Sequence, residues 1–67
     1  MMNKDLAGAR VRCLHMNDPR PVPPGTEGTV QFVDDIGTIH VRWDNGQGLG
    51  LVPLEDQYEF ISYPEQT

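Results

Sequence analysis

A chain of 67 residues forms at most one domain, and a domain of this size is marginally stable. Its formal net charge is −5 and only five residues are Lys or Arg, which disfavours nucleic acid as a partner because phosphate binding needs clustered cations. One cysteine excludes an intramolecular disulfide framework, and residues 1–10 lack the apolar run of a signal peptide. No stretch approaches the roughly 20 apolar residues of a membrane span, so we expect a cytoplasmic protein that binds no membrane.

The first predicted strand covers Ala9–Met16 and follows a flexible, polar tail over residues 1–8. Val11 and Cys13 alternate with two arginines along this stretch. Such alternation is typical of a half-buried strand, with the apolar side chains on one face and the arginines on the other.

A proline-rich loop is predicted over residues 17–25. Four prolines occur within the six residues 19–24, and proline is incompatible with a helix interior or a central strand. We expect a long, stiff loop, because proline lowers the entropy of the unfolded chain.

Two further strands are predicted over residues 29–33 and 38–43, joined by a turn. Strict alternation places Val30 and Phe32 together on the inner face of the first of these strands. The same rule places Trp43 on the inner face of the second strand.

The remaining predicted elements are short. They are a fourth strand over residues 49–52, a single helical or 3-10 turn over residues 53–56, a last strand over residues 58–62 and a frayed tail over residues 63–67. Five short strands without a helix-period segment predict an all-β domain, residues 9–62, folded as a small barrel or curled sheet.

The glycine-rich stretch after Trp43 predicts a turn and not a phosphate-binding loop, because Pro53 interrupts any helix that would follow. A three-residue loop over residues 44–46 places Gly46 in the left-handed bulge position. This register pairs Val41 with Leu49 and Ile39 with Leu51, so that both leucines point inward. It leaves Gly48 and Gly50 on the outer face.

On that outer face the two glycines lie opposite Arg42 and His40 in the predicted register. Glycine within a strand marks a bend or a close backbone approach, so this strip has two interpretations. One is a bend of the barrel, and the other is a shallow surface where a partner lies against bare backbone.

Two aromatic residues are candidates for a partner-binding groove. Trp43 is either a core residue at the edge of the barrel or a groove aromatic, and Tyr58 is either a packed ring or a border of the same groove. The acidic residues of the predicted turns either bond the local backbone or form a patch for a basic partner; they are Asp34, Asp35, Asp44, Glu55 and Asp56.

Neither a metal site nor a cofactor site is predicted. Cys13, His15 and His40 do not form a pair with zinc-ligand spacing, and the acidic turns lack the calcium-loop pattern. A cysteine–histidine nucleophile would require the fold to bring these residues together. We therefore expect no enzymatic activity, and Cys13 is interpreted as a small buried apolar residue.

The stretch GTEGTVQFVDDIGTIHVRWDNGQGLGLVPLED, residues 25–56, closely resembles an uncharacterised family of small bacterial and phage proteins. The likeness extends to GARVRCLHMNDP, residues 8–19, and departs at Ala9, where that family often has an acidic residue. A more distant resemblance, through the V-x-W-D-N-G motif, is to the small domain of mind-bomb-type ubiquitin ligases.

The second resemblance implies a five-stranded SH3-like barrel with a short 3-10 turn before the last strand, and it implies protein or peptide binding. We therefore expect a small binding or adaptor module, as a monomer or weak homodimer, because exposed sheet edges allow self-association. The alternative function is a small barrel associated with nucleic acid.

Overall fold

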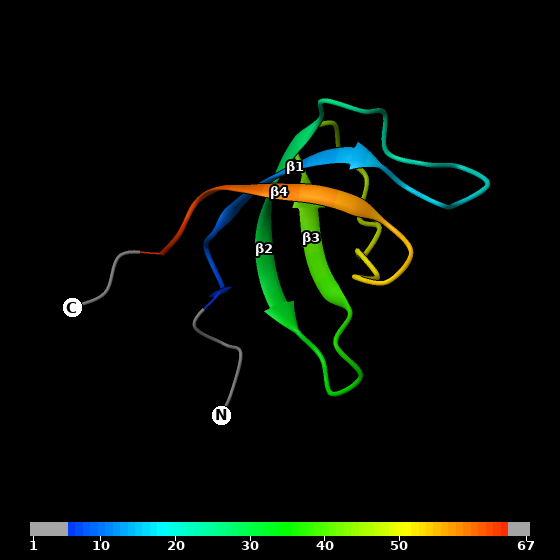
Figure 1. Cartoon of the computed structure of the whole chain (residues 1–67). Helices are drawn as coiled ribbons and strands as arrows, with labels where there is room; N and C mark the ends of the chain where they lie inside the picture. Colours follow the sequence, from blue (N-terminus) through cyan, green and yellow to red (C-terminus); the bar gives the residue numbers. More distant parts are fainter. Residues whose placement is uncertain (1–5, 65–67) are drawn as a thin grey trace.

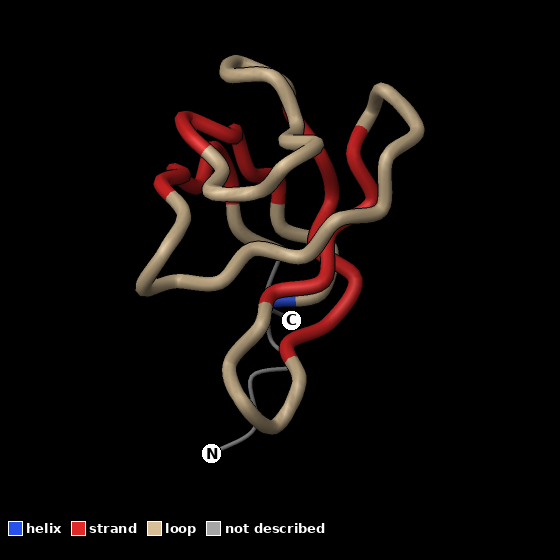
Figure 2. Tube along the Cα trace, turned by 90° about the vertical axis from the view of Figure 1, so that its right-hand side faces the viewer, coloured by secondary structure: helices blue, strands red, loops and turns tan. Residues whose placement is uncertain are grey.

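The computed structural model describes residues 6–64 and shows an all-β domain (Figure 1). Its strands form one antiparallel sheet in the order β3-β2-β1-β4. The strand bounds are β1 Arg10–His15, β2 Glu27–Val33, β3 Ile39–Trp43 and β4 Gln57–Ser62. Figure 2 shows these short strands joined by long loops. The prediction of an all-β class is confirmed, and the four strands fall within two residues of their expected starts and ends.

The predicted strand over residues 49–52 is not formed. Only an isolated bridge remains, in which Ile39 and Leu51 exchange two backbone hydrogen bonds of 2.9 and 2.8 Å. The indole N–H of Trp43 donates to the Leu49 carbonyl at 2.7 Å, so this carbonyl is bonded to a side chain in place of a neighbouring strand. Among the described residues the sheet therefore has four strands and is not closed into a barrel by hydrogen bonds.

The turn that precedes this bridge has the predicted register. The Trp43 N–H donates to the Gln47 carbonyl at 3.0 Å and the Gly46 N–H donates to the Trp43 carbonyl at 2.9 Å. Gly46 has a φ of 95°, a left-handed conformation that glycine adopts without steric cost. The three-residue loop is confirmed, and it brings Leu51 into the core.

The core contains four side chains from outside the strands: Ala9 and Met16, which flank β1, Val22 of the proline-rich loop, and Leu51. Its buried members are Ala9, Val11, Cys13, Met16, Val22, Val30, Ile39, Val41, Trp43 and Leu51. Gly28 lies against this cluster so closely that a β-carbon would fall 2.6 Å from Val41 Cγ1. The absence of a side chain at Gly28 allows β2 and β3 to pack closely beside the indole ring of Trp43.

A β-bulge at Gln31 corrects the predicted facing of Phe32. Val30 pairs with Val41, but Phe32 pairs with His40, so β2 contains one extra residue between the two pairs. The extra residue turns Phe32 to the outer face, where half of its surface is exposed, while Val30 stays buried.

The Asp56 carboxylate connects the chain just after β1 to the turn that precedes β4. The chain turns after Val52, whose carbonyl accepts hydrogen bonds from the N–H groups of Glu55 and Asp56 at 2.9 Å each. The Asp56 carboxylate accepts hydrogen bonds from the N–H groups of Asn17 and Val52, both at 2.8 Å. Of the two interpretations of Asp56, the bond to the local backbone agrees with the contact to Val52, and burial leaves its carboxylate unable to join an exposed acidic patch.

The contacts of the sheet extend beyond the predicted domain start at residue 9. The Gly8 N–H donates to the Val30 carbonyl at 2.8 Å, and Leu6 packs against the core. At the other end Tyr63 stacks on Phe60 with ring centroids 5.3 Å apart. The remaining parts of the two predicted tails, residues 1–5 and 65–67, lie outside the described residues.

Candidate functional site

Five of the outward-facing residues on β2, β3 and the following segment form one surface, which we call the outer strip: Phe32, His40, Arg42, Gly48 and Gly50. β2 contributes the first, β3 contributes the next two, and the glycines come from the segment after the turn. The bridge and turn contacts of β3 place His40 opposite Gly50 and Arg42 opposite Gly48. The structure therefore brings together four predicted partner-binding residues and adds Phe32.

Phe32 and His40 stack at one end of the outer strip. Their ring centroids are 4.2 Å apart and their planes differ by 11°. The bulge at Gln31 produces this contact, because it places the two side chains on the same face as cross-strand neighbours. The result is an exposed flat aromatic pair on the outside of the sheet.

Asp34 positions His40 from the turn between β2 and β3. One carboxylate oxygen bonds the His40 Nε2 atom at 2.8 Å, and the other accepts hydrogen bonds from the N–H groups of Ile36 and Thr38 at 3.1 and 2.9 Å. The hydrogen bond to His40, followed by those from the backbone, lowers the pKa of Asp34. Asp35, also predicted to bind a partner, is exposed in the same turn.

The two glycines of the outer strip have different environments. A β-carbon at Gly50 would lie 2.8 Å from Thr38 Cγ2, so close packing accounts for glycine there. At Gly48 a β-carbon would meet nothing within 4 Å, and the φ of Gly48 is outside the left-handed region. The contacts of the described residues therefore give no reason for glycine at position 48.

Arg42 supplies an exposed cation in the middle of the outer strip. It forms no ion pair within residues 6–64. The guanidinium group is planar and carries five N–H donors, which suits it to bidentate recognition of a carboxylate. Two other arginines, Arg10 and Arg12, differ from Arg42 because carboxylates of this chain already bind them.

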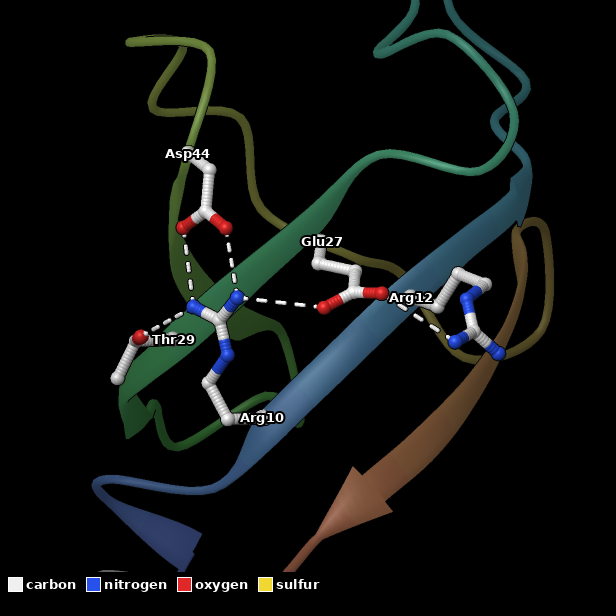
Figure 3. Close-up of polar contacts among 5 residues, drawn as sticks. All are labelled: Arg10, Arg12, Glu27, Thr29 and Asp44. Carbon is white, nitrogen blue, oxygen red and sulfur yellow. Dashed lines mark hydrogen bonds and ion pairs between the residues drawn. The ribbon is translucent and has the colours of Figure 1, made fainter.

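Arg10 lies on the same outer face and is held by Asp44, the first residue of the glycine-rich turn (Figure 3). Two hydrogen bonds of 2.9 and 2.6 Å join the guanidinium to the two oxygens of this carboxylate, and Thr29 Oγ1 accepts a third at 3.0 Å. Hydrogen bonding between the pair raises the pKa of Arg10 and lowers the pKa of Asp44.

Glu27 links this pair to the next arginine. Its two oxygens accept hydrogen bonds from Arg10 at 3.4 Å and from Arg12 at 3.2 Å (Figure 3). Arg12 also pairs with Glu59 on β4, and these hydrogen bonds raise its pKa. Positive and negative side chains thus alternate across β1, β2 and β4, which leaves neither Arg10 nor Arg12 free for a partner.

Neither predicted groove aromatic lies on the outer strip. Trp43 is only 1% exposed and belongs to the core, so it offers no exposed ring to a partner in this structure. Tyr58 lies half-buried on β4, at the opposite end of the sheet order, with its ring edge-on to Phe60 at 5.9 Å. Burial, and then the charge of Asp56, raises the pKa of Tyr58.

Cys13 is enclosed in the core, where its thiol donates a hydrogen bond to the Val22 carbonyl at 3.5 Å. Burial, and then the charge of Asp56, raises the pKa of this thiol. His40 bonds Asp34, not Cys13. Within residues 6–64 no group of three or more His, Cys, Asp or Glu side chains is arranged to hold a metal ion.

Sequence reasoning missed Phe32 because it assumed uninterrupted alternation. A signal was present, since Val30 and Val33 are both apolar and β-branched but are separated by an odd number of positions. A strand that buries both residues needs a bulge between them.

Residues 6–64 contain no helix of the length and apolar character needed to cross a membrane, and no pocket is found among them. No curated protein and no solved structure matches this chain. A family model does match, over residues 3–61, and its description is a domain of unknown function, DUF4314. The match spans nearly the whole chain and confirms the expected membership of a family known from sequence: the protein belongs to the DUF4314 family.

Proposed function

We propose that this protein is a non-enzymatic module that binds a protein or peptide partner through the outer strip. Gly48 carries this proposal, because neither crowding nor backbone conformation requires glycine there. A glycine that its own fold does not need permits close approach by another chain. Exposed side chains that can contribute to binding surround it, namely the Phe32–His40 pair and the cation of Arg42.

The chemistry of the outer strip defines the partner that we propose. Arg42 would bind a carboxylate of the partner, and Phe32, which lies on the neighbouring strand and pairs with His40, would pack against an apolar side chain. The bare backbone of Gly48 and Gly50, on the other side of β3, would allow an extended segment to lie flat. The partner is therefore an extended stretch of polypeptide with an acidic and an apolar residue.

The fold that we propose for this module is an SH3-like barrel in a reduced form. The layout supports this assignment: β4 pairs with β1, β1 with β2, β2 with β3, and β3 with the bridge at Leu51. A short turn separates that bridge from β4. The distant resemblance to the mind-bomb-type small domain agrees with this order and with binding of a protein or peptide, and we propose that the module acts in the cytoplasm.

Affinity capture from a lysate of the source cells, with quantitative mass spectrometry, tests the proposal. The wild-type chain and Leu54→Ala, a change at a residue 98% exposed and outside the outer strip, should retain the same partner. Phe32→Ala, Arg42→Ala and Gly48→Leu should each lose it while their thermal midpoints stay close to wild type. Equal capture by all five proteins would reject the outer strip as the binding surface.

A second candidate function is association with single-stranded nucleic acid. The exposed Phe32–His40 stack beside Arg42 favours it, because aromatic side chains and arginine stack on bases. The net charge of −5 and the carboxylates on Arg10 and Arg12 count against it. Titration with mixed-sequence oligonucleotides decides: genuine binding weakens steeply with salt, and no binding at low salt removes this candidate.

A further inference from the structure

The proline-rich loop is attached to the core by one residue. Val22 is fully buried, and its carbonyl accepts the hydrogen bond from the Cys13 thiol. The residues on both sides of Val22 are exposed, and we call the exposed set the proline ridge: Pro19, Arg20, Pro21, Pro23 and Pro24. One inward side chain thus holds a row of outward proline rings against the domain, and Figure 1 shows the loop extending from β1 to β2.

The C-terminal end of the loop is fixed to β1. The Cys13 carbonyl accepts a hydrogen bond from the Gly25 N–H at 2.7 Å, and the Cys13 N–H donates to the Thr26 carbonyl at 2.8 Å. The Thr26 N–H also donates to the Pro23 carbonyl at 3.1 Å. Together with the φ of 91° at Gly25, this bond defines a type II turn with Pro24 in its second position.

The backbone of residues 21–24 in the proline ridge is restricted to an extended, polyproline-type conformation. Each proline has φ near −65°, and each residue that precedes a proline is displaced from the helical region. The second position of a type II turn has the same extended conformation. Residues 21–24, which follow the bend at Arg20, are therefore expected to have a polyproline II path, which has three residues per turn.

Three residues per turn divide this path into three edges. Val22 occupies the edge that faces the core. Pro21 and Pro24, three positions apart, share a second edge, and Pro23 occupies the third. Because the first edge is buried, the other two edges face solvent and display these three prolines, and the cation of Arg20 lies at the bend just before them.

We propose that the proline ridge is itself a ligand, taken by a proline-recognition groove that has aromatic walls and an acidic rim. Such grooves bind two adjacent edges of a polyproline II helix and leave the remaining edge free. Here the remaining edge is the one that Val22 attaches to the core. The core holds the ligand in its bound shape before binding, which removes most of the ordering cost.

Arg20 indicates which charge the partner's groove carries at its rim. It forms no ion pair within residues 6–64, and its carbonyl accepts a hydrogen bond from Gln47 Nε2 at 3.5 Å. The backbone at Arg20 is thereby held against the glycine-rich turn while the guanidinium is exposed. A carboxylate at the rim of the groove would pair with this cation. The proline ridge shares no residue with the outer strip, although the contact of Gln47 with Arg20 places the two surfaces next to each other, and it would bind a partner of its own.

The test is an NMR titration of the ¹⁵N-labelled full chain with three unlabelled proline-binding domains: an SH3 domain, a WW domain and an EVH1 domain. We expect saturable binding to at least one of them, with a dissociation constant below about 1 mM. The amide signals that shift should belong to Arg20, Val22 and Gly25. Shifts confined to the outer strip, or no shift with any domain, would overturn the proposal.

Two variants separate a ligand from a loop that is merely stiff. The double variant Pro21→Ala/Pro24→Ala should weaken binding at least tenfold, and Pro53→Ala, which changes an exposed proline in another turn, should bind as wild type does. Arg20→Ala should weaken binding to a smaller extent and reduce its salt dependence. Unchanged affinity of a folded double variant, with its Trp43 fluorescence intact, would also overturn the proposal.

Discussion

Two irregular segments meet where the Gln47 side chain reaches the Arg20 carbonyl, and they are held in place by opposite means. The proline-rich loop has a restricted backbone and inserts one side chain, Val22, into the core. The glycine-rich segment after Trp43 has a permissive backbone and is held by an indole hydrogen bond and by the bridge at Leu51. Neither segment pairs as a regular strand, and each keeps its shape through a few individual contacts.

The strongest way to disturb the glycine-rich segment is Leu51→Ala. Leu51 is fully buried, so we expect a loss of about 3 kcal/mol in the free energy of unfolding, from lost burial and the cavity that remains. Urea denaturation measures it. Leu54→Ala, in the same part of the chain but 98% exposed, is the control and should stay within about 0.5 kcal/mol of wild type. Equal effects of the two changes would contradict the placement of Leu51.

The corresponding change in the proline-rich loop is Val22→Ala. We expect it to cost about 2 kcal/mol, because two methyl groups leave the core and the loop backbone is too restricted to fill the space. Val52→Ala is the matched control, since Val52 is 38% exposed and the chemical change is the same. Both are compared by urea midpoints, and a cost at Val22 no larger than at Val52 would show that proline alone holds the loop.

Trp43→Phe isolates the hydrogen bond that diverts the glycine-rich segment from strand pairing. It keeps an aromatic ring in the core but removes the indole N–H that binds the Leu49 carbonyl. We expect a loss of about 1–2 kcal/mol. Amide hydrogen exchange should accelerate more at Gln47 and Leu51, whose N–H groups are hydrogen-bonded, than at Gly25 in the other segment. A uniform change across both segments would mean that the indole only fills space.

Asp44→Asn tests the ion pair that ties the glycine-rich turn to β1. The pKa of Asp44 is lowered by Arg10, so its stabilising contribution is present above the ordinary aspartate pKa of about 3.9 and is lost as pH falls through the folded-state pKa. Wild type should therefore be more stable than the variant at neutral pH, and the two should converge in strong acid. Urea midpoints across this pH range measure it, and a gap independent of pH would exclude the charge as its cause.

The elements with a local signal could be predicted from the sequence. The three-residue turn follows from Gly46 and from the need to bury Leu51, and both are visible in a short stretch of residues. The same reasoning predicts that His40, Arg42 and the two glycines share one face. It also predicts a strand over residues 49–52, because nothing in the sequence shows that an indole will take the Leu49 carbonyl.

The features that escaped prediction depend on contacts between distant residues. Val22 stands among prolines and has no periodic pattern that would mark it as buried. Asp56 resembles the exposed acidic turn residues, yet it is buried because it binds a backbone N–H group 39 residues away, at Asn17. The core interpretation of Trp43 is confirmed, but Trp43 and Tyr58 do not border one groove, because they lie on opposite edge strands of the sheet.

The extra residue at Gln31 predicts how this family can vary in length. If Gln31 were deleted, Phe32 would follow Val30 directly, and strict alternation would then keep Phe32 outside and Val33 inside. The stack on His40, the buried Val30 and the half-buried Val33 would survive in a strand without the bulge. Natural relatives one residue shorter at this point should therefore keep the same surface, and insertions elsewhere in β2, which would reverse its faces, should be selected against.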